Sequence, residues 1–298
     1  MRGSQERRPV LVAVANLDHV EQLVRTGCDL ARVVDGHVRI VSVVVKRRGS
    51  PFSMFSDETI VERFARDTQE ILDAATEVAP PDVPIEREVL VDHSVAGGRR
   101  SAITATGARA LVVGWHGHQT RTEAILGTNL DRLITHAPCD LFVERIGYEA
   151  NGVDSIMVLV AGGPHVRPAA VAEKAIAARN EATVYILSVV RSNGDVDAAR
   201  EDIATAERLV EDAPGPDVPI ESSHRVGNDV PAVIAETATD HDVLIVGVTR
   251  RSAVRRRIVG SIPQAVLPRT DRTLLLARSV DVVGRPRFGP LKRLQRES

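Results

Sequence analysis

Short, almost continuously apolar runs alternate along the chain with longer segments whose apolar residues recur three or four positions apart. Runs rich in valine, isoleucine and leucine are typical of strands buried on both faces of a parallel sheet. The longer segments, such as 19–34 and 57–79, have the spacing of amphipathic helices. This alternation predicts an α/β fold. The strands predicted in the first half are 10–14, 38–45, 85–91, 110–114 and 141–144.

The same order of segments occurs a second time. The pentapeptide DVPIE at 82–86 returns at 217–221, and ALVVG at 110–114 corresponds to VLIVG at 243–247. From Gly114 onward the halves align without a gap, so that LFVER at 141–145 matches LLLAR at 274–278. The second set of predicted strands is 156–160, 184–190, 220–226, 243–247 and 273–277. We therefore expect two homologous domains, 1–148 and 149–280, followed by a basic, disordered tail at 281–298.

Composition narrows the function classes. The chain has 298 residues, a formal net charge of −2 and only 3% aromatic residues, which argues against a dedicated nucleic-acid-binding protein. Its two cysteines, Cys28 and Cys139, are too few for a disulfide framework, so a reducing cytoplasm is the expected location. No apolar stretch approaches the ~18 residues of a membrane-spanning helix, so no transmembrane segment is expected.

A glycine pattern follows the fourth predicted strand. It consists of Gly114, two residues, Gly117, nine residues, Gly127 and Thr128, and the next predicted helix begins at Asn129. Glycines let the backbone turn at positive φ and approach a ligand closely. A helix start offers unpaired N–H groups to an anion, and Thr128 can cap the helix or bind a phosphate oxygen. The pattern predicts a nucleotide phosphate site at these five residues.

The second half carries a changed copy of this pattern. It reads Gly247, two residues, Arg250, nine residues, Gly260 and Ser261. Arg250 removes one close backbone approach, although its guanidinium could itself pair with phosphate. We expect this second site to be degenerate or altered in ligand.

Other chemistries find little support. The lysine-containing phosphate loop of P-loop NTPases is absent, and no G-x-G-x-x-G follows the first strand. His116 and His118 flank Gly117, but no third metal ligand has a recognisable spacing. Neither a catalytic triad nor a metal site is predicted.

The span 114–143, GWHGHQTRTEAILGTNLDRLITHAPCDLFV, resembles the universal stress protein family. ATP-binding members of that family carry G-x2-G-x9-G-[S/T] after the fourth strand, then a helix, an APC turn and a fifth strand. The resemblance extends over 9–278 in tandem. It implies two Rossmann-like (adenine nucleotide alpha hydrolase-like) domains, each a five-stranded parallel sheet of order 3-2-1-4-5 flanked by helices. It further implies an internal pseudo-dimer and ATP or a related adenine nucleotide as ligand, with magnesium as a candidate companion.

Two departures from the family pattern bear on the ligand. ATP-binding members usually place an aspartate after the first strand to hold the adenine, whereas the corresponding residues here are Ala15 and Ala161, with Asn16 and Asp18 as neighbouring substitutes. The segment 162–165, GGPH, resembles a variant found in related domains that accompany archaeal transporters.

Three functions therefore stay open. The first is a regulatory protein that binds an adenine nucleotide, mainly in its first domain, with slow hydrolysis at most because no general base or magnesium carboxylate is evident. The second is a nucleotide-independent interaction module, with an unknown protein partner such as a membrane transporter. The third, and least favoured, is a hydrolytic enzyme. A homodimer is compatible with each of them.

Overall fold

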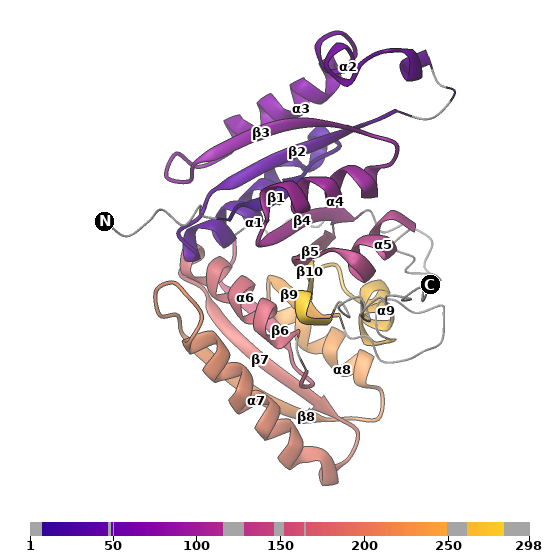
Figure 1. Ribbon diagram of the computed structural model, residues 1–298. Helices are drawn as coiled ribbons and strands as arrows, with labels where there is room; N and C mark the ends of the chain where they lie inside the picture. Colours follow the sequence, from indigo (N-terminus) through magenta and orange to yellow (C-terminus); the bar gives the residue numbers. More distant parts are fainter. Residues whose placement is uncertain are drawn as a thin grey trace, which may run out of the picture.

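The strands form one continuous sheet that is covered by helices on both faces (Figure 1). The computed structural model describes residues 8–46, 49, 51–115, 128–145, 152–163, 165–248 and 261–282. Within these ranges the sheet has ten strands, in the order β3-β2-β1-β4-β5-β10-β9-β6-β7-β8.

The first half of the sheet has the expected order 3-2-1-4-5, and all its neighbouring strands are parallel. Its strands are β1 (Val10–Ala13), β2 (Val38–Val45), β3 (Ile85–Asp92), β4 (Ala110–Trp115) and β5 (Asp140–Arg145). Its helices are α1 (Val20–Val33), α2 (Asp57–Phe64), α3 (Arg66–Glu77), α4 (Val95–Thr106) and α5 (Thr128–His136). Parallel neighbours bring the carboxyl ends of β1 and β4 side by side, with Ala13 opposite Val113.

The second half repeats this order as β8-β7-β6-β9-β10. Its strands are β6 (Ser155–Leu159), β7 (Thr183–Val190), β8 (Ile220–Val226), β9 (Val243–Gly247) and β10 (Thr273–Arg278). Its helices are α6 (Val166–Asn180), α7 (Val196–Glu211), α8 (Val230–Thr237) and α9 (Ser261–Val266). Short 3-10 helices occur at Leu17–His19, Pro51–Met54, Asn193–Asp195, Ala238–Asp240, Leu267–Arg269 and Val280–Val282.

Two apolar cores lie on opposite faces of the sheet. Successive residues of a strand point to opposite faces, so Val10 and Val12 join one core while Leu11 and Ala13 join the other. Helices α1, α3, α6 and α7 cover the first core, and α4, α5, α8 and α9 cover the second. Burial on both faces explains why the strands are nearly continuous in apolar residues.

The two halves join through an antiparallel pairing of β5 with β10, in which Phe142 lies opposite Ala277. A buried arginine from each half secures this junction. Arg145 donates hydrogen bonds to the carbonyl oxygens of Leu267 (3.0 Å) and Arg272. Arg278, its counterpart in the repeat, donates to the carbonyl oxygens of Ala137 (2.8 Å) and Cys139 (2.9 Å). The implied pseudo-dimer is thus built as a single sheet.

One predicted helix is divided. The segment 57–79 forms α2 and α3, which meet at Ala65, where φ is −100° and ψ is 23°. Ala65 is buried, and the side-chain amide of Gln69 donates to the carbonyl oxygen of Val61 (3.3 Å). This side-chain bond occupies a carbonyl close to the break, where the helical ladder is interrupted.

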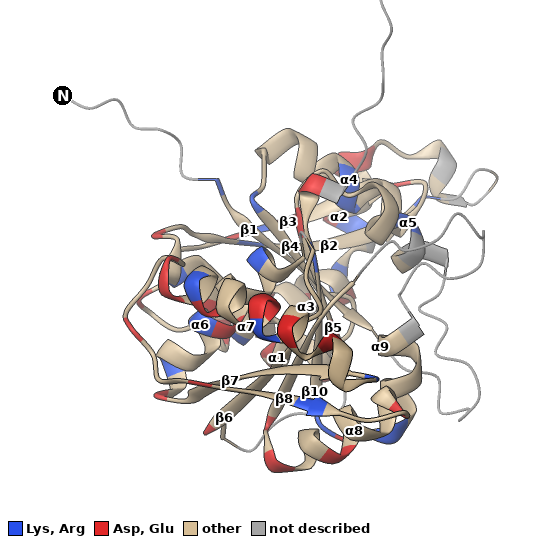
Figure 2. Ribbon diagram, turned by 90° about the horizontal axis from the view of Figure 1, so that it is seen from below, with Lys and Arg blue, Asp and Glu red and all other residues tan. Residues whose placement is uncertain are grey.

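Lys or Arg and Asp or Glu positions are interspersed along the outer helices, including α6 and α7 (Figure 2). None of the helices in the described ranges combines the length and apolar composition needed to cross a membrane.

Candidate functional site

The first candidate site lies where β4 ends and α5 begins. Gly114 is the penultimate residue of β4, and the next residue, Trp115, is buried in the core that also contains Leu130 of α5. Because β4 and β5 are parallel, α5 returns the chain from the end of β4 to the start of β5, so the helix start stands at the carboxyl edge of the sheet, where open α/β sheets bind ligands. Gly117, Gly127 and the side chains of Thr128 and Asn129 fall outside the described part of the structure.

The chain leaves β1 beside this edge. Ala15 is exposed, and Asn16 accepts a hydrogen bond from the N–H of Asp18 (3.2 Å), which starts the short helix before α1. Asn16 and Asp18 are both exposed. One acceptor lone pair of Asn16 is therefore engaged in this local cap, while its amide N–H groups and the Asp18 carboxylate remain accessible.

A buried cation that the sequence patterns did not single out lies on α4. Arg99 is 8% exposed, and its side chain makes no hydrogen bond or ion pair with any residue that the structure describes. Burial lowers its pKa to about 10. Helix α4 begins directly after β3, so its first turns stand at the carboxyl edge of the sheet, and Ala102, one turn further along, packs in the same core as Trp115. The sequence signal that could have indicated this buried cation is an arginine at a position of the helix that the apolar pattern assigns to the core.

In the second candidate site a residue from another segment, His165, lies over the glycine at the strand end. Gly247 ends β9 and α9 begins at Ser261, whereas Arg250 and Gly260 fall outside the described residues. His165 packs directly against Gly247, where an added Cβ would lie 3.0 Å from the Cβ of His165. The imidazole Nδ1 of His165 accepts a hydrogen bond from the N–H of Ser279 (3.1 Å). The ring therefore lies over the carboxyl ends of β9 and β10.

Local backbone geometry explains this position of His165. Gly162 and Gly163 after β6 have φ values of +67° and +93°, which favour glycine. A Cβ on Gly162 would also come within 2.8 Å of a carboxylate oxygen of Asp202. Burial, with a smaller contribution from Arg278, lowers the pKa of His165 to about 4, so the ring is neutral at pH 7 and its Nδ1 can accept the hydrogen bond from Ser279. The sequence pattern drew attention to this glycine pair, but not to the contact that it allows.

No metal-binding cluster accompanies either site within the described ranges, where no three histidine, cysteine, aspartate or glutamate side chains gather closely enough to hold an ion. His116 and His118 lie outside those ranges.

Comparison with known protein families shows to which family the chain belongs. The model of the universal stress protein family matches residues 6–145 and again 152–278. The chain belongs to the universal stress protein family. It is a tandem member, with one family unit in each half of the ten-stranded sheet. No curated protein matches it significantly.

Solved structures share the fold of this universal stress protein over nearly its whole length. A universal stress protein from Archaeoglobus fulgidus DSM 4304 has a TM-score of 0.61 at 13% identity, covering 92% of this chain and 97% of its own. A functionally unknown protein from Pseudomonas aeruginosa PAO1 has a TM-score of 0.59 at 17% identity, covering 94% and 95%. The cytoplasmic domain of a prokaryotic cation chloride cotransporter has a TM-score of 0.56 at 10% identity, covering 92% and 96%. These likenesses confirm the two-unit α/β fold.

Proposed function

We propose that this universal stress protein is a regulatory protein that binds an adenine nucleotide, ATP or a close relative, in its first domain. The observation that carries the proposal is the junction of β4 and α5. There Gly114 and the N-terminal end of α5 both stand at the carboxyl edge of a parallel sheet. Backbone N–H groups of Gly114, Gly117, Gly127 and Thr128 would hold the phosphates, with the side chains of Thr128 and Asn129 assisting.

The asymmetry between the two domains supports a single nucleotide. In the second domain the Cβ and backbone of His165 already occupy the space against Gly247, and its imidazole accepts a hydrogen bond from the N–H of Ser279. A nucleotide there would have to displace a buried side chain and leave the N–H of Ser279 without its acceptor. The alternative second site, formed by Gly247, Arg250, Gly260 and Ser261, is therefore the weaker one.

The charge of Arg99 also favours an anionic ligand. A guanidinium held away from water without a counter-ion is destabilising, and a nearby phosphate would offset that cost. Its position on the first turns of α4, at the same edge as the glycine turn, suits this role.

Titration calorimetry with ATP, with magnesium and with EDTA in its place, tests the proposal. A Gly127→Val variant should abolish binding, because a side chain would block the close approach of phosphate. Gly260→Val makes the same change at the corresponding second-domain glycine and should leave ATP binding intact, with one nucleotide per chain. Loss of binding in Gly260→Val alone would move the site to the second domain. An absence of ATP binding by folded, nucleotide-free protein would refute the proposal.

A nucleotide-independent module that contacts a membrane transporter is the second candidate. It is favoured by His165, which lies over Gly247 in the second candidate site. It is also favoured by a structural neighbour described as the cytoplasmic domain of a cotransporter. Under this alternative neither Gly127→Val nor Gly260→Val changes binding to the transporter partner. Purified protein then releases no molecule absorbing at 260 nm on denaturation.

A further inference from the structure

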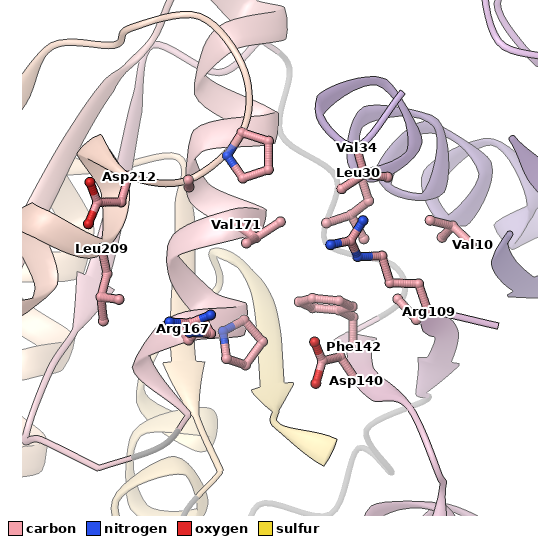
Figure 3. A pocket seen from close by; sticks show the side chains of 14 residues that line it. Val10, Leu30, Val34, Arg109, Asp140, Phe142, Arg167, Val171, Leu209 and Asp212 are labelled. Atoms are coloured by element: carbon pink, nitrogen blue, oxygen red, sulfur yellow. The ribbon is translucent and has the colours of Figure 1, made fainter. Parts of the chain in front are cut away.

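A cleft of about 310 Å³ opens where the two domains meet, on the face of the sheet that carries α1 and α6 (Figure 3). The first domain contributes the amino ends of three neighbouring strands, marked by Val10, Ala110 and Asp140. The second domain contributes the start of α6 and the turn after α7, including Pro168 and Ala213. We call this cleft the junction pocket. It lies at the edge of the first domain opposite to Gly114, and neither Gly114 nor Gly247 lines it.

The walls of the junction pocket are largely apolar. Phe142, 2% exposed, is held rigidly in β5, while Leu30 and Val34 approach from α1 and Val171 from α6. Figure 3 shows these side chains around one space. A volume near 300 Å³ is at the small end of the range for ligand sites, and an aromatic face with aliphatic walls suits a compact apolar group.

Two arginines enter this space from opposite sides, one from each domain. Arg109 precedes β4 and Arg167 lies in the first turn of α6, with Phe142 and Asp140 between them (Figure 3). Both arginines are exposed, and the guanidinium group of neither makes a hydrogen bond or ion pair with any residue that the structure describes. Guanidinium groups bind carboxylates and phosphates through paired N–H donors, and these donors are available.

Neither carboxylate of the pocket forms an ion pair with these arginines within the described residues. Asp140 accepts a hydrogen bond from the N–H of Val280 (2.8 Å) and interacts electrostatically with Arg278 and, more weakly, with Arg109, so it offsets only part of the positive charge. Asp212 is exposed to solvent and lies at the outer, second-domain end of the pocket (Figure 3).

The pseudo-symmetric counterpart on the other side of the junction contains a carboxylate whose oxygens accept hydrogen bonds from the protein itself. It has about 320 Å³ and contains the buried carboxylate of Glu144. That carboxylate accepts hydrogen bonds from Gln22 (3.0 Å) and Thr26 (2.8 Å). Arg25 and Arg179 also line this cleft, so the two clefts differ in the hydrogen-bonded carboxylate, and no comparable bonds reach the guanidinium groups of Arg109 or Arg167 within the described residues.

We propose that the junction pocket binds a small organic carboxylate, in which a carboxylate group held by Arg109 and Arg167 is carried on an apolar chain or ring packed against Phe142. Because each domain supplies one arginine, the bound carboxylate links the two halves of the molecule. This site is independent of the proposed nucleotide site.

Titration of the full chain with hexanoate, hexan-1-ol, hexylamine and inorganic phosphate tests the proposal by calorimetry. Hexanoate should bind, whereas the neutral, cationic and chain-free probes should bind at least about tenfold more weakly. Arg109→Gln and Arg167→Gln should each weaken hexanoate binding about tenfold. Val171→Phe, which fills the pocket and keeps both charges, should also abolish binding.

Arg100→Gln is the matched control, because it removes an exposed arginine from α4 on the opposite face of the sheet and should leave hexanoate binding unchanged. Circular dichroism establishes that each variant is folded. Equal binding of hexan-1-ol or hexylamine, or hexanoate binding unaffected by both arginine variants, would overturn the proposal. So would competition between hexanoate and ATP that Gly127→Val abolishes, because the probe would then occupy the nucleotide site. Failure of ATP to bind would leave the hexanoate result standing.

Discussion

Arg99 carries a positive charge into the interior of the first domain, and its effects on stability and on binding should have opposite signs. Replacing it with methionine removes a buried cation that has no counter-ion among the described residues. Because burial lowers its pKa to about 10, Arg99→Met should raise the free energy of unfolding by about 1–3 kcal/mol. The same change should weaken ATP binding in the calorimeter. Arg100→Met, at an exposed neighbour, should change neither by more than about 0.5 kcal/mol.

Glu173 of α6 should make stability depend on pH. Its carboxyl is 1% exposed, and burial raises its pKa to about 8 from an ordinary value of 4.5. Between these values the unfolded chain loses this proton while the folded chain keeps it. The stabilising contribution is therefore complete below about pH 4.5 and disappears as the pH rises through about 8, at no more than about 1.4 kcal/mol per unit.

Glu173→Gln should flatten the decline in unfolding free energy over this interval, as measured by urea denaturation at several pH values. Part of the slope should remain, because burial also raises the pKa of Asp29 to about 7. Glu77→Gln, an exposed glutamate on α3, is the control and should retain the full slope. An unchanged slope in Glu173→Gln would contradict the assignment.

At the scale of elements, helix α1 approaches its sheet closely because Gly27 faces β1. A Cβ on Gly27 would lie 2.2 Å from a methyl carbon of Val12, which is itself fully buried and cannot withdraw. Gly27→Ala should therefore lower the free energy of unfolding by about 1–3 kcal/mol, measured by thermal or urea denaturation. Gly194→Ala, where the nearest atom is 3.6 Å away, should be close to neutral. Equal effects of the two changes would show that the close packing of α1 is unimportant.

The helices and strands were largely predictable, because strands that are buried on both faces of the sheet are nearly continuous runs of apolar residues. All ten predicted strands occur with small shifts at their ends; for example, the first ends at Ala13 and the fifth extends over Asp140–Arg145. The break at Ala65 was not predictable, because the helical spacing continues through it and the cause is a tertiary position.

The sites were less predictable, because their members come from distant segments. Sequence spacing located Gly114 and the start of α5, and the fold places both at one edge. It could not indicate that His165 would pack against Gly247, a contact between the start of α6 and the end of β9. The junction pocket is harder still, because it needs both domains, and neither Arg109 nor Arg167 belongs to a recognisable motif.

At the scale of the whole molecule, the pairing of β5 with β10 makes each half the cover of the other half's sheet edge. A fragment comprising residues 1–148 would expose the edge of β5, including Leu141 and Val143, which are buried in the full chain. Exposed apolar edges pair with other chains. The folded fragment should therefore dimerise or aggregate at micromolar concentration in sedimentation experiments, and a folded monomer would contradict this view of the junction.

The strand directions also determine which side of the molecule faces the support when the protein is attached to a sensor surface. A series of hydrogen bonds connects the two ends of the described chain across one edge of the sheet. Arg109 donates its N–H to the carbonyl of Pro9 (2.9 Å), Asp140 to that of Arg109 (3.2 Å), and Val280 to the carboxylate of Asp140 (2.8 Å). Gly114 lies at the opposite edge of the first domain. Protein attached to a sensor surface through a side chain next to Pro9 or Val280 would therefore have Gly114 on the side of the first domain away from the support, while the junction pocket would lie on the side nearer the support.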